Sequence, residues 1–287
     1  MANKLNLRDN MHMNDKVGNS HPKTLWKKTE IIGGYGLYTD DKGISQLKEV
    51  VFSIENLVPL GGVQYAMESI FGVKGPVTVP TLNDAYGIGA IGSTIVPSGG
   101  LPYAYGQKVC LFGIGTGGAA ENNLSVLDVK YNENNIIDMV PFRYTNESLA
   151  SSDQGKYYGK KNVDGTQAYF LKAFDQDAVI RHLYKNGEEG EDGSEVDSSI
   201  WDSTSEIGIE SFVEMQLTIS KKDVREWFEA QGNIEECRVN SIGLYTAVYD
   251  ATLKDYANIQ LFSKLNIPTE PLALTKDMNI IYRVYGA

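Results

Sequence analysis

The segment IESFVEMQLTIS, residues 209–220, constrains the fold most, because apolar and polar side chains nearly alternate along it. The apolar positions nearly in phase are Phe212, Met215, Leu217 and Ile219. A period of two residues is typical of a β-strand that presents one face to a core and the other to solvent. The segment therefore predicts a half-buried strand.

Similar short segments recur along the chain and make the expected class mainly β. The expected strands are 31–40, 48–54, 109–115, 124–131, 136–144, 168–174, 178–184, 239–250, 258–267 and 278–286. The first two flank a turn at Asp40–Gly43, and 168–174 is expected to pair with 178–184. We predict an antiparallel β-sandwich with two short helices and long ordered loops, in a single domain over residues 30–287.

Two helices are expected between the strands. One runs from Gly62 to Phe71, where apolar residues follow helical spacing, and it ends at Gly72. The other runs over Lys221–Gln231, after a Ser220–Asp223 capping pattern, with Val224, Trp227 and Phe228 on one apolar face. Residues 72–108 are rich in glycine and proline and predict a long ordered loop.

A glycine-rich run, LFGIGTGGAAENN, matches the spacing of a dinucleotide-binding fingerprint from Gly113 to Gly118. Such a site needs a helix directly after the glycines, whose backbone N–H groups hold the pyrophosphate. Here the residues after Gly118 return to strand alternation instead. We therefore interpret the run as a strand that enters a bend where glycine accommodates positive φ, and we expect no nucleotide to bind.

Other candidate sites do not assemble a chemistry from the sequence. His12, His21 and His182 are isolated, and Cys110 and Cys237 form no Cys-x-x-Cys pair. The acidic run 186–206 has eight carboxylates and no Lys or Arg, but it lacks the order of a calcium loop, which favours a solvated loop over a Ca²⁺ site. Neighbouring acids such as Asp175 with Asp177, or Glu235 with Glu236, act in a glycosidase only where the fold sets them across a sugar. We expect no catalytic residue, no cofactor and no metal ion.

The charge is distributed unevenly. The chain carries −11 in all, whereas residues 1–29 carry +4. An acidic chain disfavours direct nucleic-acid binding, and the sequence shows neither a signal-peptide core nor a long apolar span. We interpret residues 1–29 either as a disordered tail or as an extended arm that orders on a neighbouring acidic subunit. The expected interface residues are Lys23, Trp26, Lys27 and Lys28.

A short internal echo joins the two halves of the chain. Gly36–Thr39, GLYT, recurs as Gly243–Thr246, and each copy precedes a strand that contains Phe. Two matching hairpins could pair about a pseudo-two-fold axis. Four identical residues also recur by chance, so a duplication stays one of two interpretations.

Three segments together resemble structural proteins of tailed bacteriophage particles: LGGVQYAMESIFGVKG, the stretch from Cys110 to Tyr144, and the C-terminal part from Val239 to Gly286. The last resembles a pattern of phage neck and tail proteins, with a Gly-Leu-Tyr strand, a Phe-containing strand, a Pro-containing link and a final Ile-Tyr-Arg strand. The resemblance implies a non-enzymatic virion component of the neck, head–tail connector or tail, made in the host cytoplasm. It also implies a symmetric ring with identical subunits and other virion proteins as partners.

Two other functions fit a β-sandwich. A receptor- or glycan-binding virion module would use the same fold with a tyrosine-rich surface. A carbohydrate-active enzyme would need a cleft lined with acids and tryptophans, and the chain has three tryptophans. Assembly into a ring, binding of sugars and turnover of a polysaccharide distinguish the three.

Overall fold

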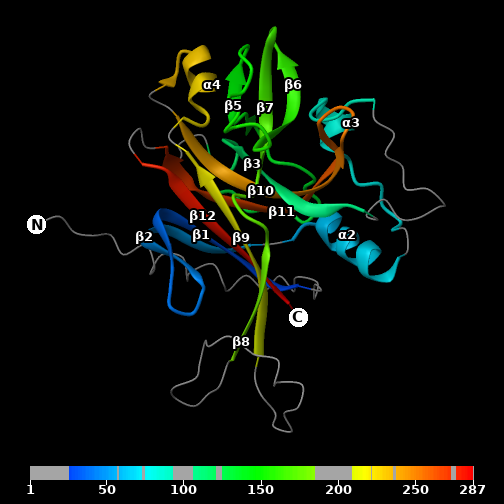
Figure 1. Cartoon of the computed structure of the whole chain (residues 1–287). Helices are drawn as coiled ribbons and strands as arrows, with labels where there is room; N and C mark the ends of the chain where they lie inside the picture. The colour runs from blue at the N-terminus through cyan, green and yellow to red at the C-terminus, as the bar shows by residue number, and fades with distance from the viewer. Residues whose placement is uncertain are drawn as a thin grey trace, which may run out of the picture.

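The computed structural model describes residues 26–56, 58–72, 75–92, 106–120, 125–184, 209–220, 222–234, 237–272 and 276–286. The described chain is mainly β, with two antiparallel sheets and short helices at their margins (Figure 1). The predicted fold class, an antiparallel sandwich-like arrangement, is confirmed.

The smaller sheet has five strands in the order β2-β1-β12-β9-β8. Their bounds are β1 Trp26–Thr39, β2 Ser45–Asn56, β8 Val179–Tyr184, β9 Ile209–Ile219 and β12 Met278–Gly286. β9, the strand with the clearest alternation, lies inside this sheet between β12 and β8. In Figure 1 the β8 and β9 strands extend away from the body of the molecule.

The larger sheet has seven strands. β11-β10-β3-β7-β5 are its ordered path, with β4 added to β3 and β6 added to β7. Their bounds are β3 Lys108–Gly115, β4 Met139–Val140, β5 Arg143–Thr145, β6 Tyr157–Val163, β7 Thr166–Ala173, β10 Arg238–Asp250 and β11 Asp255–Pro271. The sequence interpretation missed β6.

The expected pairing of residues 168–174 with 178–184 is wrong. β7 pairs with β6 across Asp164 and Gly165, whose φ angles are 52° and 84°. Two successive positive φ angles are typical of a tight hairpin turn, and Asp-Gly is the sequence signal for it. β8 instead crosses to the smaller sheet and pairs with β9.

The main core lies between the two sheets. It takes Phe112, Ile242 and Leu244 from the larger sheet and Leu217, Ile280 and Tyr282 from the smaller one. The rings of Phe112 and Tyr282 lie 6.3 Å apart between centroids. A second cluster, with Leu111, Tyr245 and Ile259, lies on the other face of the larger sheet. β10 is buried on both faces because Leu244 and Tyr245, adjacent in sequence, enter different clusters.

Helix α2, Leu60–Phe71, confirms the expected helix and ends at Gly72, whose φ is 65°. It packs against β11 at Gly62, where an added Cβ would lie 1.9 Å from the carbonyl oxygen of Phe262. Within the loop predicted over 72–108 lies a short helix that the sequence interpretation missed, α3, Leu82–Tyr86. Its signal is a Thr-x-x-Asp cap, because the Thr81 hydroxyl accepts from the Asp84 N–H at 3.0 Å.

The helix expected over Lys221–Gln231 is shorter, because α4 spans Arg225–Ala230. Val224 precedes it with φ 69°, and its side chain is fully buried. The Asp223 carboxylate does accept from the Ser220 N–H at 2.8 Å, as a cap would, but it also binds Lys172. Asp223 therefore bonds outside the helix and lies before the start of α4.

We expect Trp227→Ala to lower the free energy of unfolding by about 2 kcal/mol, below the loss for a fully buried tryptophan. Trp227 is half-buried against the main core, and its ring meets Tyr144 edge-on at 5.2 Å. Urea denaturation of the two proteins measures the difference. Glu229→Ala, an exposed position on the same helix, is the control. Equal stability of the Trp227 variant and the parent would contradict this packing.

Two further strand expectations are corrected by the structure. Within 124–131, the described residues 125–131 contain an isolated bridge, Ala119 with Val126, and no extended strand. The GLYT hairpins lie in different sheets, so they do not pair with each other. Gly36 has φ 72° near an exposed hairpin end, whereas Gly243 lies in the buried middle of β10. The two copies therefore occupy unlike environments.

The β1–β2 hairpin folds back over the outer face of the smaller sheet. Its tip places Ile44 in a cluster with Leu183, Phe212 and Tyr285, which come from β8, β9 and β12. The predicted turn is present, since the Asp40 carboxylate accepts from the backbone N–H groups of Lys42 and Ile44. The hairpin tip thus covers part of the face that is turned away from the core.

Candidate functional site

The predicted interface residues lie at the start of β1. β1 begins at Trp26, so the backbone of residues 26–29 belongs to the sheet and the domain begins four residues before the predicted boundary at 30. Trp26 is opposite Gly286 and Lys28 opposite Tyr285 on β12, with a bulge between them. The side chains of Trp26, Lys27 and Lys28, and the whole of Lys23, lie outside the described residues. The remainder of the predicted arm, residues 1–25, lies outside the described residues as well.

The start of β1 lies at one end of the smaller sheet, close to the β8–β9 hairpin. Tyr285 on β12 is opposite Phe212 on β9, and Phe212 is opposite Arg181 on β8. β1 therefore starts at the sheet end from which β8 and β9 extend (Figure 1).

The glycine run has a structural role that differs from the predicted one. None of Gly113, Gly115, Gly117 and Gly118 has positive φ. An added Cβ at Gly113 would lie 2.8 Å from the Tyr245 ring, and at Gly118 it would lie 2.0 Å from the Asn240 carbonyl oxygen. Close approach of other segments, and not backbone conformation, requires these glycines: β10 approaches Gly113 and Gly118, and residues 136–138 approach Gly115 and Gly117. After Gly118 the described residues form the Ala119–Val126 bridge, which presents no helix N-terminus; the absence of nucleotide binding stays a prediction.

Buried charges in the described chain join elements together. Lys172 on β7 contacts Asp223 at 2.8 Å, and their side chains are 5% and 0% exposed. The Lys172 ammonium also donates to the Thr218 carbonyl oxygen on β9 at 2.5 Å, so the pair links the two sheets. Tyr157 donates to the other Asp223 oxygen at 2.6 Å, and burial followed by this carboxylate raises the Tyr157 pKa. The charged or polar side-chain atoms of Lys172, Asp223 and Tyr157 therefore all take part in hydrogen bonds.

A second network holds α4 against β5. The Arg143 guanidinium donates two hydrogen bonds to Glu226, at 2.9 and 2.8 Å, and a third to Asp153 at 3.1 Å. Lys222 also donates to Asp153, and this hydrogen bond is the main reason that the Asp153 pKa is lowered. These charges serve to fix the position of the helix.

A third network closes the β1–β2 hairpin on the sheet. Arg283 on β12 donates to Glu214 on β9 at 3.0 Å and to the Ser45 carbonyl oxygen at 2.7 Å. The Ser45 hydroxyl bonds to Glu214 and accepts from Gln216. All four residues are buried. We call this set, Ser45, Glu214, Gln216 and Arg283, the hairpin clamp.

His182 is the described histidine, and its Nδ1 lies 2.8 Å from the Ser211 hydroxyl. The two residues are directly opposite each other on β8 and β9, so the contact follows from strand register. Among the described residues no carboxylate is bonded to this imidazole, and His182 is exposed. A hydroxyl–imidazole pair without an orienting group or an oxyanion site is a weak nucleophile candidate.

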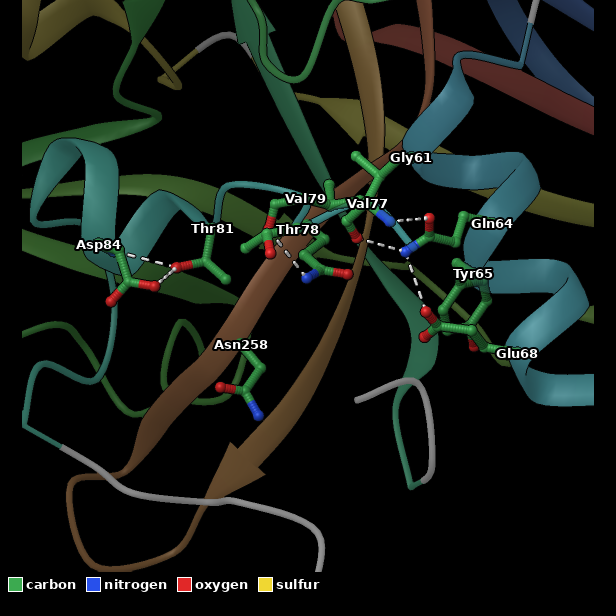
Figure 2. A pocket seen from close by; sticks show the side chains of 11 residues that line it. Gly61, Gln64, Tyr65, Glu68, Val77, Thr78, Val79, Thr81, Asp84 and Asn258 are labelled. Atoms are coloured by element: carbon green, nitrogen blue, oxygen red, sulfur yellow. Dashed lines mark hydrogen bonds between the residues drawn. The ribbon is translucent and has the colours of Figure 1, made fainter. Parts of the chain in front are cut away.

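A shallow pocket lies between α2, the 77–81 segment and β11, with a volume near 150 Å³ (Figure 2). Its polar groups largely bond to one another. The Gln64 amide donates to the Val77 carbonyl oxygen at 2.7 Å and accepts from the Val77 N–H at 3.2 Å. The Glu68 carboxylate accepts from Gln64 and from the Gly75 N–H. These hydrogen bonds therefore hold the 75–81 segment on α2. They leave few polar groups in the pocket that could bind a ligand.

The other predicted candidates differ in what the structure describes of them. Asp175 and Asp177 are exposed in the β7–β8 connection. The acidic run 186–206, Glu235, Glu236, His12 and His21 lie outside the described residues. No group of three or more His, Cys, Asp or Glu side chains within the described ranges is arranged to hold a metal ion. No described helix has the length and apolar character to span a membrane.

Both cysteines are buried and free. Burial raises the pKa of the Cys110 thiol to about 11 and also raises the pKa of Cys237. We expect iodoacetamide to label Cys110 in the folded protein at pH 8 about 100-fold more slowly than an ordinary thiol, because the thiolate is the nucleophile. Mass spectrometry measures the uptake, and protein unfolded in urea is the control. Rapid labelling of Cys110 without unfolding would contradict the burial.

No family model, no curated protein and no solved structure matches this chain.

Proposed function

We propose that this chain is a non-enzymatic structural subunit of a tailed-bacteriophage particle, in the neck, head–tail connector or tail. The sequence resemblance described above motivates the proposal. The observation that carries its mechanism is the position of β1, which starts at Trp26 at one end of the smaller sheet and so fixes where residues 1–25 join the domain. A segment of this length can reach about 80 Å when extended. It is long enough to cross to a neighbouring subunit.

The use of buried polar groups supports a structural role. The ion pairs of Lys172, Arg143 and Arg283 each join separate elements of the domain, and those of Lys172 and Arg283 are buried. The pocket in Figure 2 is lined by groups bonded to each other. A subunit that bears load in an assembly needs a rigid domain and an extended connection, and it needs no reactive group. The domain would fold in the host cytoplasm and take its place in the virion as part of a symmetric ring.

Charge favours contact between copies. Residues 1–29 carry +4 in a chain whose total is −11, so the rest of the chain is strongly acidic. Residues 1–25 have few apolar side chains, and folding them on their own domain would cost about 1–2 kcal/mol of backbone entropy per residue. Contact with a neighbour, repeated around a ring, supplies attraction at every copy.

Deletion of residues 1–25 tests this proposal. The cut leaves all of β1, so we expect the truncated protein to keep its circular dichroism spectrum and melting temperature. We expect the concentration needed for ring formation to rise by about tenfold or more. Mass photometry and negative-stain electron microscopy measure the assembly, and raising the salt concentration of the full chain should produce part of the same loss. If both proteins assemble equally at every salt concentration, the arm is a tail and the proposed ring does not depend on it.

A glycan-binding virion module is the second candidate, and a tyrosine cluster favours it. The rings of Tyr158, Tyr249 and Tyr256 pack edge-on with centroids 4.8 to 6.2 Å apart, and Tyr249 is 47% exposed. Exposed aromatic rings provide flat apolar surfaces against which a sugar ring can pack. A glycan array with the purified protein tests this. Binding that Tyr249→Ala abolishes supports the module, and an array without binding excludes it for the sugars present.

A further inference from the structure

β8 forms one edge of the smaller sheet and exposes apolar side chains on both of its faces. Among the described residues it pairs with β9 alone. Val179 is 37% exposed and Ile180 is 64% exposed. Because neighbours in a strand point to opposite faces, both faces of β8 are partly exposed at residues 179 and 180, whereas the β1–β2 tip covers the outer face at Leu183. A sheet edge also presents backbone N–H and C=O groups without a partner strand, and such an edge can accept a further strand.

One face of β8 is the face of the smaller sheet that packs on the main core, but this part of it is not covered by the larger sheet. Ile180 is opposite Val213, and Tyr184 is opposite Ile209, so these four share a face, with the polar pair His182–Ser211 between them. Along β9 the same face leads to Met215 and Leu217, which are buried in the main core. Ile209 is 40% exposed at the outer end. We call Ile180, Tyr184, Ile209 and Val213 the β8 strip.

The opposite edge of the same sheet differs. On β2, exposed Val50 follows exposed Lys48 and Glu49. Charged side chains on an edge strand discourage pairing with another chain. The smaller sheet therefore has one apolar edge, β8, and one charged edge, β2, and substitutions at the two edges can be compared.

The N-terminal segment has the pattern of a strand suited to this edge. Between residues 4 and 14 the apolar side chains stand at odd positions, Leu5, Leu7, Met11 and Met13, with Asp9 the exception. The even positions are all polar: Lys4, Asn6, Arg8, Asn10, His12 and Asn14. Neither proline nor glycine interrupts this stretch. Alternation over eleven residues predicts a strand with one apolar face.

We propose that residues 4–13 of one copy add as a strand to the β8 edge of a second copy, with the odd-numbered apolar side chains against the β8 strip. This inference rests on the proposed function, and it names the acceptor surface for the arm. The polar face of the added strand, with Lys4 and Arg8, then lies on the side of Glu210, which shares a face with Val179. β-Strand addition of this kind combines backbone hydrogen bonds with side-chain pockets on one face.

The occupant is a second copy because donor and acceptor are different surfaces of one subunit. The arm enters at β1, and the acceptor is β8, with β12 and β9 between them. A contact between unlike surfaces is heterologous, and such contacts generate a ring where the rotation between copies closes and an open filament where it does not. The thirteen Cα-to-Cα steps from Met13 to Trp26 span up to about 43 Å, enough to bridge two adjacent subunits.

Edge variants of the full-length chain provide the first test. We expect Ile180→Asp to raise the concentration needed for assembly by about tenfold or more, and Leu5→Asp with Leu7→Asp to do the same. Val50→Asp, at the equally exposed position on the β2 edge, should leave assembly unchanged. Melting temperatures of all variants establish that each is folded. Normal assembly of Ile180→Asp overturns the proposed acceptor.

Cross-linking provides the second test and identifies the occupant. In a chain with Leu7→Cys and Ile180→Cys, oxidation should yield a ladder of covalent oligomers on a non-reducing gel, while each single variant yields none. The buried native cysteines give little background. A cross-linked monomer without a ladder would show that the arm lies on its own domain and would overturn the proposal. If no cross-link forms but deletion of residues 1–25 still abolishes assembly, the acceptor is wrong and the arm-dependent ring stands. If deletion has no effect either, the proposed function fails as well.

Discussion

Replacing Lys172 with Met is expected to lower the free energy of unfolding by about 3–5 kcal/mol. The substitution keeps the length of the side chain and removes its charge. Asp223, whose side chain is fully buried, then keeps hydrogen bonds from Tyr157 and Ser220 but loses its cation. An uncompensated buried carboxylate is costly because it has left water without gaining an opposite charge. The Thr218 carbonyl oxygen loses its donor as well, which weakens the link between the two sheets.

Urea denaturation at pH 7 measures the effect of Lys172→Met. Lys276→Met is the matched control, because Lys276 pairs with Glu49 at 3.5 Å while both side chains are about 60% exposed. A solvent-exposed pair contributes about 0–1 kcal/mol, so this variant should stay close to the parent. Equal losses in the two variants would contradict the distinction between buried and exposed pairs.

Replacing Arg283 with Met is expected to cost a similar amount, about 3–5 kcal/mol. Arg283 is the cation of the hairpin clamp. Its loss leaves the buried Glu214 carboxylate with its contact to the Ser45 hydroxyl but without a cation, and it leaves the Ser45 carbonyl oxygen without its donor. The effect should be local as well as global, because the clamp holds the β1–β2 tip on the outer face of the smaller sheet. Hydrogen exchange of the amides of residues 44–47 should accelerate more than that of β10.

A double variant separates charge from packing in the hairpin clamp. In Arg283→Met with Glu214→Gln, the remaining group is a neutral amide that can still bond to Ser45. We expect this variant to recover about 1–2 kcal/mol relative to Arg283→Met alone. A double variant that is less stable than the single one would show that the carboxylate contributes through contacts other than Arg283.

Local patterns predicted many elements well. β9 and β12 were expected because each alternates or concentrates β-forming side chains between turn signals. α2 was expected from its apolar spacing and from Gly72, since both the helix face and its end depend on a few neighbouring residues. The β6–β7 hairpin also had a local signal, Asp164-Gly165, which the sequence interpretation overlooked. This hairpin could therefore have been predicted from the sequence.

Other features depend on residues far apart in the chain. α4 starts only after Val224, which has φ 69° and donates its N–H to the carbonyl oxygen of Phe142, and after Asp223, which binds Lys172 from β7. Gly113 and Gly118 are required by the approach of Tyr245 and Asn240 from β10, which lies more than a hundred residues further along the sequence. The hairpin clamp joins Ser45 to Glu214 and Arg283, and no local pattern marks such a set.

The sequence by itself determined the class of the fold, most of the strands, one helix to within two residues and the charge contrast between residues 1–29 and the rest of the chain. These follow from side-chain period, turn residues and composition, which act over a few residues. The tertiary structure alone decided which sheet each strand joins, which charges are buried together and which edge exposes apolar side chains. Strand order and burial depend on contacts between distant segments, so β7 and β8, five residues apart, lie in different sheets. For the same reason the arm was predicted from its charge, whereas its acceptor on β8 could be proposed only after the sheet edges were known.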